Sequence, residues 1–293
     1  MKKKIIQFGN KLLVKKKLRI MRILKYGKDQ RFLDLKSNKI YLDVNGELEY
    51  IIKKTNPFKE DLRKERYENW IKNFFLKQSE NNIAKLSYFL AQSQSQNKQD
   101  LFVLANMNFK ENGFFVEFGA TNGIDISNSY LLEKEFQWTG ILAEPARGYH
   151  KALRENRNCI IETDCVWKKS NEKLLFIENG VLSTLNEFKD SDMHTRNSQT
   201  EYSVNTISLN DLLEKNNSPK VIDYLSIDTE GSEFKILNSF DFSKYEIKII
   251  TVEHNYTQSR EKIFNLLSSN GYNRVLTDVS AYDDWYLLEN YEK

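Results

Sequence analysis

The chain has 293 residues, of which 40% are hydrophobic and 29% charged, a balance that excludes general disorder and leaves room for one catalytic domain plus an extension. Its two cysteines, Cys159 and Cys165, have neither metal-site spacing nor the density of a disulfide-stapled fold, so we expect a reducing compartment. The sequence has no apolar run of about 18 residues and no signal-peptide pattern, which predicts a cytoplasmic protein without a membrane span.

The first 28 residues differ in charge from the rest. Residues 2–28 hold eleven Lys or Arg and no acid, whereas the remainder holds 33 basic against 41 acidic residues. Basic and apolar residues are interleaved, which suits a helix lying on an anionic membrane and equally a solvated helix packed on its own domain. We expect this basic amphipathic arm, residues 1–28, to contact the inner membrane face or a glycosyltransferase. Nucleic acid ranks last among the partners because the acidic body opposes a polyanion.

Residues 29–85 are predicted to form an accessory region with a hairpin and helices. The pair Asn45-Gly46 separates two β-prone runs within 40–51, which is a strong hairpin signal. An amphipathic helix is predicted to begin at Pro57 and to run to about residue 77, and further helices are predicted at 83–92 and 101–107. The main domain then covers residues 86–293.

From Gly113 onward, short apolar runs alternate with helical patterns, which predicts an α/β fold with a doubly wound parallel sheet. The strands are predicted at 114–118, 139–143, 159–163, 221–227 and 247–253, with a closing pair at 274–278 and 285–288. The helices are predicted at 127–136, 148–156, 232–238 and 260–270.

The first strand leads into a loop typical of nucleotide-binding folds. Glu117 stands two positions before Gly119, and Gly123 follows four residues later. Thr121 occupies the place where a dinucleotide fingerprint needs its middle glycine, which disfavours pyrophosphate. A ligand with an adenosine and a charged amino-acid tail fits better, because Glu117 can take an ammonium group. S-adenosylmethionine meets this description, and a purely structural turn is the alternative.

The next two strands add further candidates for the cofactor site. Glu144 ends the second strand at the distance where such folds place an acid for the ribose hydroxyls. Asp164 and Cys165 follow the third strand and would lie beside the adenine.

The fourth and fifth strands carry the candidate catalytic groups. Asp228, Glu230 and Glu233 follow one strand end, and His254 follows the other. Crowded carboxylates raise one another's pKa, so Asp228, Glu230 and His254 are predicted to supply a general base or, alternatively, to hold a divalent cation such as Mg or Mn. Glu233 equally suits the first turn of a helix. His150 and His194 are predicted to be non-catalytic.

In these motifs the chain resembles the FkbM-type methyltransferases, a branch of the class I S-adenosylmethionine-dependent enzymes. The resemblance covers roughly residues 87–290, and the matching blocks are 95–104, 114–145, 203–213, 224–242 and 282–288. The stretch from Cys165 to Trp167 departs from the small residue and Ser-Asp-like turn of many relatives.

The resemblance implies a Rossmann-like, seven-stranded class I sheet and O-methylation, commonly of a sugar hydroxyl in a surface glycan or glycoconjugate. It also implies a cofactor site that includes Asp228 and the residues of the first two loops, which are Glu117, Phe118, Gly119, Asn122, Gly123, Ser127, Glu144 and Pro145.

Two alternatives stay open at this stage. The first is a non-catalytic S-adenosylmethionine-binding scaffold of a glycan-assembly complex, and the second is a nucleotide-dependent oxidoreductase, which would want the glycine that Thr121 replaces. The polar stretch at 190–200 is interpreted either as a lid over the acceptor or as a mobile loop.

Overall fold

The computed structural model describes residues 78–191 and 199–289, Phe74 and Phe75, and the course of six strands between Ile5 and Tyr50. The chain divides into two compact units, residues 1–93 and residues 94–293. Within the described part, no helix combines the length and the apolar character that a bilayer span requires.

The first unit contains a six-stranded antiparallel sheet in which each strand pairs with the next along the chain. Its strands are β1 (Ile5–Phe8), β2 (Lys11–Val14), β3 (Arg19–Tyr26), β4 (Asp29–Asp34), β5 (Lys39–Val44) and β6 (Glu47–Tyr50). Helix α3 (Glu80–Phe89) lies against β3 and β4 and begins at Ser79, whose side chain accepts a hydrogen bond from the Asn82 backbone.

The helix predicted within residues 1–28 is wrong, since strands β1, β2 and β3 occupy most of this range. The physical reason lies in the turn residues of the sequence. Gly9-Asn10 separates β1 from β2 by two residues, and Gly27-Lys28 separates β3 from β4, and such glycine-containing pairs favour hairpins over a continuous helix. The hairpin predicted within 40–51 is confirmed as β5 and β6. Of the helix predicted at 57–77, only Phe74 and Phe75 belong to the described residues.

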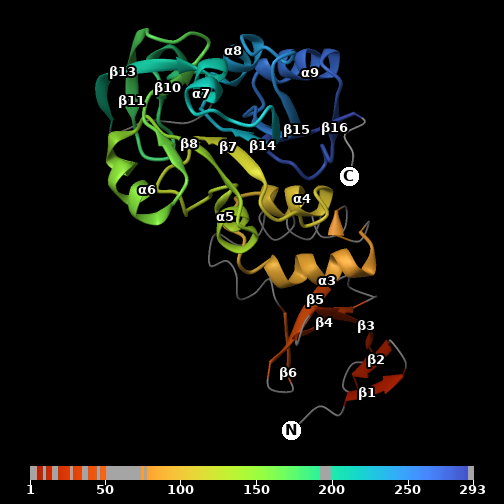
Figure 1. The fold of residues 1–293 in the computed structure, drawn as a ribbon. Helices are drawn as coiled ribbons and strands as arrows, with labels where there is room; N and C mark the ends of the chain where they lie inside the picture. The colour runs from red at the N-terminus through yellow and green to blue at the C-terminus, as the bar shows by residue number, and fades with distance from the viewer. Residues whose placement is uncertain are drawn as a thin grey trace. The chain divides into compact units, whose positions relative to one another are not determined.

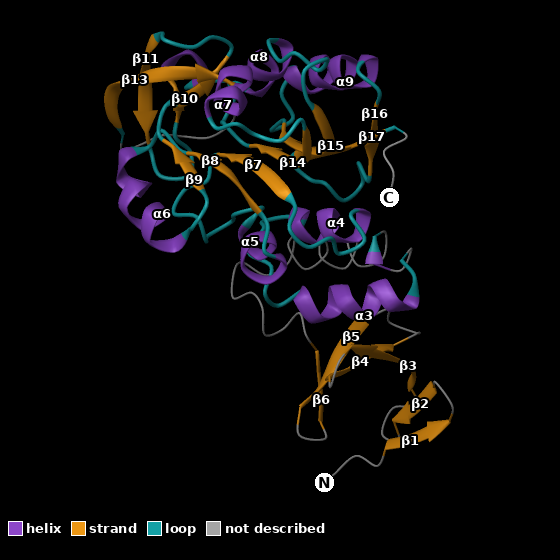
Figure 2. Cartoon of the chain, in the orientation of Figure 1, coloured by secondary structure: helices purple, strands orange, loops and turns teal. Residues whose placement is uncertain are grey.

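The second unit is built on a seven-stranded sheet in the order β16-β17-β15-β14-β7-β8-β9 (Figures 1 and 2). Its strands are β7 (Phe114–Phe118), β8 (Thr139–Ala143), β9 (Ile160–Glu162), β14 (Val221–Ile227), β15 (Glu246–Glu253), β16 (Tyr272–Val275) and β17 (Asp283–Leu288). Five neighbouring strands of this sheet, β15, β14, β7, β8 and β9, pair in parallel. Strand β17 lies between β15 and β16 and is antiparallel to both. The mixed α/β prediction is confirmed.

Helices cover both faces of this sheet (Figure 1). The group α7 (Leu209–Lys215), α8 (Glu233–Asn238) and α9 (Ser259–Ser269) lies on one face, where its leucines and isoleucines join the main core. Helices α4 (Gln99–Asn106) and α5 (Tyr130–Phe136) lie on the other, while α6 (His150–Asn156) follows a short 3-10 turn, η2 (Arg147–Tyr149).

A second, four-stranded sheet stands beside the first and was not predicted. Its order is β10-β13-β11-β12, formed by β10 (Cys165–Trp167), β13 (Thr200–Ser208), β11 (Lys173–Glu178) and β12 (Thr184–Leu185), and β12 leads into the 3-10 turn η3 (Asn186–Phe188). A small apolar core of its own holds it together, including Trp167, Phe176 and Leu185.

The register of the main sheet brings the strand ends together. Phe118 pairs with both Ala143 and Ile227, and Ile227 pairs with Val252. The residues that follow β7, β8, β14 and β15 therefore leave the sheet at the same edge, which is where parallel α/β sheets bind ligands.

Candidate functional site

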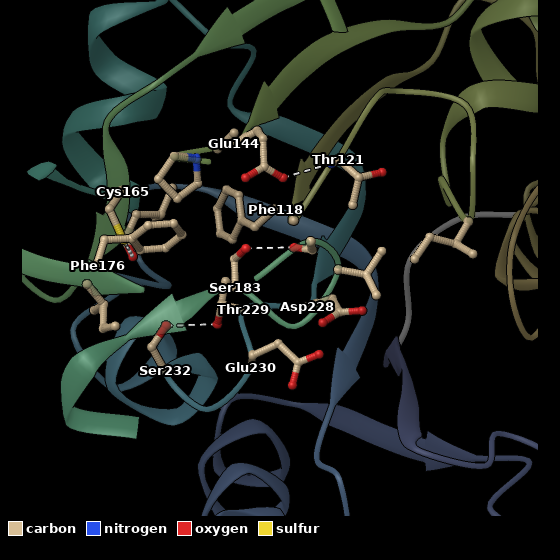
Figure 3. A pocket seen from close by; sticks show the side chains of 18 residues that line it. Phe118, Thr121, Glu144, Cys165, Phe176, Ser183, Asp228, Thr229, Glu230 and Ser232 are labelled. Carbon is tan, nitrogen blue, oxygen red and sulfur yellow. Dashed lines mark hydrogen bonds between the residues drawn. The ribbon is translucent and has the colours of Figure 1, made fainter. Parts of the chain in front are cut away.

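A pocket lies at this carboxyl edge, between the ends of β7, β8 and β14 and the second sheet (Figure 3). Apolar side chains of Phe118, Cys165 and Phe176 form one part of its lining, and the carboxylates of Glu144, Asp228 and Glu230 stand around it. The pocket thus combines an apolar wall with convergent acids.

Glu117 organises the first loop from within the protein. Its carboxylate accepts hydrogen bonds from the Asn128 backbone N–H at 2.7 Å, from the Ser127 hydroxyl at 3.0 Å and from the Ser129 hydroxyl. The side chain is buried and does not line the pocket. Glu117 and Ser127, both predicted at the cofactor, thus bind each other. The three donors to Glu117 lie at residues 127–129, directly before α5 begins at Tyr130.

Arg157, which sequence analysis missed, ties the same loop to the residues after α6. Its fully buried guanidinium donates to the Gly123 carbonyl at 3.0 Å, to the Ser127 hydroxyl at 3.1 Å and to the Ser129 hydroxyl at 2.9 Å, and it pairs with Glu133 at 2.7 Å. Burial pushes the pKa of Glu133 upward, but Arg157 and further hydrogen bonds outweigh it and hold that pKa below its usual value. An arginine after a predicted helix carries no sequence signal for this role.

Gly119 and Thr121 set the course of the loop past the pocket. Gly119 has a φ of +75°, and a Cβ there would lie 2.1 Å from the Asp228 carbonyl oxygen, so only glycine allows β7 and β14 to approach this closely. Thr121 has a φ of 48°, and its backbone N–H donates to Glu144 Oε2 at 2.8 Å. A pyrophosphate would compete with Glu144 for that N–H, which agrees with the sequence pattern that disfavours pyrophosphate.

Asn122 and Gly123 shape the same loop without lining the pocket. The Asn122 side-chain oxygen accepts from the backbone N–H groups of Ile124 at 3.0 Å and Asp125 at 2.9 Å, which closes a local turn. Gly123 has a φ of +81° and packs against Leu153 and Arg157, where a Cβ would lie within 2.8 Å of both side chains.

Glu144 lies at the pocket wall after β8, as predicted. Its two oxygens accept from the Thr121 and Ala146 backbone N–H groups, each at 2.8 Å. Burial raises the pKa of Glu144 to about 7, although these hydrogen bonds act in the opposite direction. A carboxylate offers about four acceptor positions, so two remain for ligand hydroxyls. Pro145, the next residue, lines the pocket too.

The two residues predicted beside an adenine are separated in the structure. Cys165 lines the main pocket, and burial raises the pKa of its thiol to about 12, so it is a neutral part of the wall. Asp164 instead lines a neighbouring polar hollow, which it shares with Arg147, His150 and Lys173. Pro145 borders both hollows.

Three carboxylates gather where β14 and β15 end. The groups of Asp228, Glu230 and Glu253 each place an oxygen within 4.8 Å of the others. Burial and the nearby Asp283 raise the pKa of Asp228 to about 7, whereas a hydrogen bond with Glu253 lowers it. Burial and the neighbouring acids also raise the pKa of Glu253 well above its usual value. These three residues are called the acid cluster below.

Glu233 has a structural role, which the sequence analysis gave as the alternative to a place among the catalytic carboxylates. Its Oε1 accepts from the backbone N–H groups of Thr229 at 3.0 Å and Gly231 at 2.9 Å, and from the Thr229 hydroxyl at 2.8 Å. The loop that carries Asp228 and Glu230 is thereby fixed from its own helix, α8.

The predicted grouping of His254 with Asp228 and Glu230 is wrong, and Glu253 takes that place. Successive residues at a strand end point to opposite sides, so Glu253 joins the acids while His254 faces away. The His254 ring is buried, its Nδ1 accepts the Tyr256 backbone N–H at 2.9 Å, and its Nε2 lies 3.7 Å from Asp284. Burial lowers the pKa of His254, so the ring is neutral near pH 7.

The comparison with known protein families identifies the family of the chain. The family model described as "Methyltransferase FkbM domain" matches residues 117–285, which is more than half of the chain. The chain belongs to the FkbM methyltransferase family. Methyl transfer with S-adenosylmethionine is therefore its general class of reaction, and the matched FkbM domain contains the pocket edge, Glu144 and the whole acid cluster.

Among solved structures, the FkbM chain is similar to precorrin-6y C5,15-methyltransferase from Geobacter metallireducens GS-15. The two share 10% identity with a TM-score of 0.36, over 64% of this chain and 85% of that one. No curated protein matches the chain. The family assignment therefore rests on the domain match.

Proposed function

We propose that this protein is an O-methyltransferase that transfers the methyl group of S-adenosylmethionine to a sugar hydroxyl in a surface glycan or glycoconjugate. The acid cluster beside the pocket is the observation that carries the proposal, because carboxylates both orient sugar hydroxyls and accept their protons. The strand order, with β17 antiparallel in an otherwise parallel series, supports assignment to the class I methyltransferase fold.

The pocket residues fit the chemistry of the cofactor. Glu144 has acceptor positions left for the two ribose hydroxyls, and Phe118, Cys165 and Phe176 offer an apolar surface for an adenine. Asp228 and Glu230 give the opposite end of the pocket a negative charge that suits a sulfonium and an ammonium group. When bound, the cofactor supplies an already activated methyl group.

The remaining chemistry belongs to the protein. Asp228, with a pKa of about 7, is well matched to take the proton of an acceptor hydroxyl near neutral pH, with Glu230 and Glu253 beside it. Placing the hydroxyl in line with the methyl group supplies much of the remaining rate enhancement. A Mg or Mn ion bound to the same carboxylates is the alternative activator, and an EDTA titration of the transfer rate separates the two routes.

The proposal is tested first by calorimetry with S-adenosylmethionine and with NAD. Binding of NAD alone would remove the methyltransferase proposal in favour of an oxidoreductase. The second test is transfer of a labelled methyl group to saccharides released from the surface of the source cells. Wild type is expected to transfer and Asp228→Ala is not, whereas cofactor binding without any transfer would indicate the scaffold function.

We also propose a peripheral contact between the N-terminal unit and an anionic membrane at the inner face. Residues 2–28 hold eleven basic residues and no acid, which supports this contact, and four of the eleven lie in β2 and β3. Sedimentation with anionic vesicles should be lost when Lys15, Lys16 and Lys17 are changed to Glu. Equal sedimentation of variant and wild type would end this proposal.

A further inference from the structure

The turn after β15 has an unusual backbone. Asn255 has a φ of 43° and Tyr256 a φ of 55°, so two consecutive residues other than glycine lie in the left-handed region. Asparagine visits this region fairly readily, but a bulky tyrosine there is uncommon and strained. Such strain persists where surrounding contacts enforce it, and it is concentrated at functional sites.

Hydrogen bonds hold this turn in place from several sides. The backbone N–H groups of His254 and Asn255 donate to the Tyr282 carbonyl at 2.8 and 3.2 Å, and the Thr257 N–H donates to the His254 carbonyl at 2.8 Å. The Tyr256 N–H donates to His254 Nδ1 at 2.9 Å. The left-handed conformation of Tyr256 is thus tied to a buried imidazole.

The turn presents a fixed aromatic ring to the solvent. Tyr256 is 60% exposed, the highest value among the large exposed hydrophobic side chains of the described residues. Its ring meets His254 edge-on at 5.1 Å and Tyr282 at 6.1 Å between centroids, and these contacts fix its orientation. The apolar ring of Tyr256 is therefore exposed to solvent on a turn whose backbone is strained.

The turn that carries this ring lies next to the acid cluster. Asn255 Nδ2 lies 3.4 Å from Glu230 Oε2, and Glu253 is three residues before Tyr256. A sugar ring has an apolar face of C–H groups and an edge of hydroxyls, so it is recognised by an aromatic face combined with carboxylates. This turn supplies both.

We propose that Tyr256 is a platform on which the acceptor's sugar ring stacks, so that a hydroxyl at the ring edge meets Asp228 and Glu230. Tyr256 is then a specificity-determining residue, and the preferred acceptor is a sugar with an unobstructed C–H face. His254 is a positioning residue that acts through the Tyr256 backbone. This inference rests on the proposed methylation of a sugar.

The experiment compares Tyr256→Ala, Tyr256→Phe and Tyr256→Trp with wild type, using labelled S-adenosylmethionine and saccharides released from the source cell surface. The acceptor KM is expected to rise at least about tenfold in Tyr256→Ala, with kcat changed far less, because one stacking surface is lost. The aromatic variants should keep a KM close to wild type. Leu175→Ala, at an exposed apolar residue on β11, is the matched control.

Calorimetry with S-adenosylmethionine and thermal unfolding accompany each variant, so that a folding defect is recognised by weaker cofactor binding. An unchanged acceptor KM in Tyr256→Ala, with an active wild type, overturns the inference and leaves the proposed function intact. A wild type that binds the cofactor but methylates no saccharide overturns the proposed function and the inference with it. A KM increase that Phe and Trp rescue supports the stacking platform.

Discussion

Replacing Arg157 with methionine tests whether the buried guanidinium holds the cofactor loop. The change keeps most of the side-chain volume and removes the bonds to Gly123, Ser127 and Ser129. It also removes the Glu133 partner at 2.7 Å, so that this carboxylate, only 8% exposed, keeps Lys134 alone as an ion-pair partner at 3.0 Å. Removing one member of a buried ion pair costs about 3–5 kcal/mol. For a unit of this size, that corresponds to a fall in melting temperature of about 6–20 °C.

The assay combines thermal unfolding with calorimetry of S-adenosylmethionine. We expect the affinity for the cofactor to fall with the stability, because the loop from Thr121 to Ser129 loses its tie to Arg157. Arg154→Met is the matched control, since Arg154 is an exposed arginine in α6, three residues before Arg157, and its effect should stay within about 0.5 kcal/mol. Adding Glu133→Gln to the Arg157 variant should recover part of the loss. A melting temperature within a degree or two of wild type would refute the reasoning.

Four further predictions concern the pocket and its edge. Because the pKa of Glu144 is raised to about 7 and its ionised form is the acceptor for ribose hydroxyls, S-adenosylmethionine should bind more tightly at pH 8 than at pH 6, and Glu144→Gln should bind weakly with no such pH dependence in calorimetry. Asp228→Asn should lower the transfer rate about 10²–10⁴-fold and weaken cofactor binding far less, and a near-normal rate would remove Asp228 as the base. Gly119→Ala should abolish cofactor binding, because its Cβ would lie 2.1 Å from the Asp228 carbonyl; normal calorimetry would contradict this geometry. His254→Leu should raise the acceptor KM, whereas His254→Asn should preserve it, because an asparagine side-chain oxygen can accept the Tyr256 N–H. Equal KM values in the two variants would show that this hydrogen bond is dispensable.

The strands that shape the pocket were predictable because each is a short, buried apolar run that ends at a polar or glycine-containing turn. The predicted bounds of β7, β8 and β14 agree with the structure residue for residue. The second sheet escaped prediction for the opposite reason. Residues 165–167 of β10 pair with 206–208 of β13, some forty positions away along the chain. In β11, exposed and partly buried residues are followed by the buried Phe176 and Ile177, so the strand has no clear period.

The roles of individual acids were harder to predict than their positions. Glu117 and Glu144 both lie at the end of a buried strand, and the sequence predicted a cofactor contact for each. The structure distinguishes them through the loop donors: three groups at 127–129 point to Glu117 and draw it into the protein, whereas Glu144 takes two backbone N–H groups and still lines the pocket. Which loop donors lie near a carboxylate is a tertiary property, and no residue spacing encodes it.

The exchange of His254 for Glu253 shows how a single step of strand parity changes the chemistry assigned to a site. A histidine beside two carboxylates favours a proton relay, whereas a third carboxylate gives a purely acidic edge suited to hydroxyl groups. The displaced imidazole still reaches the site indirectly, because its Nδ1 accepts the Tyr256 N–H and so holds the turn whose Asn255 contacts Glu230. If that path operates, His254→Leu should raise the acceptor KM and leave the proton transfer itself unaffected. A pH-rate profile of His254→Asn that keeps the wild-type shape would agree with it, while loss of an inflection near neutral pH would return His254 to the acid–base chemistry.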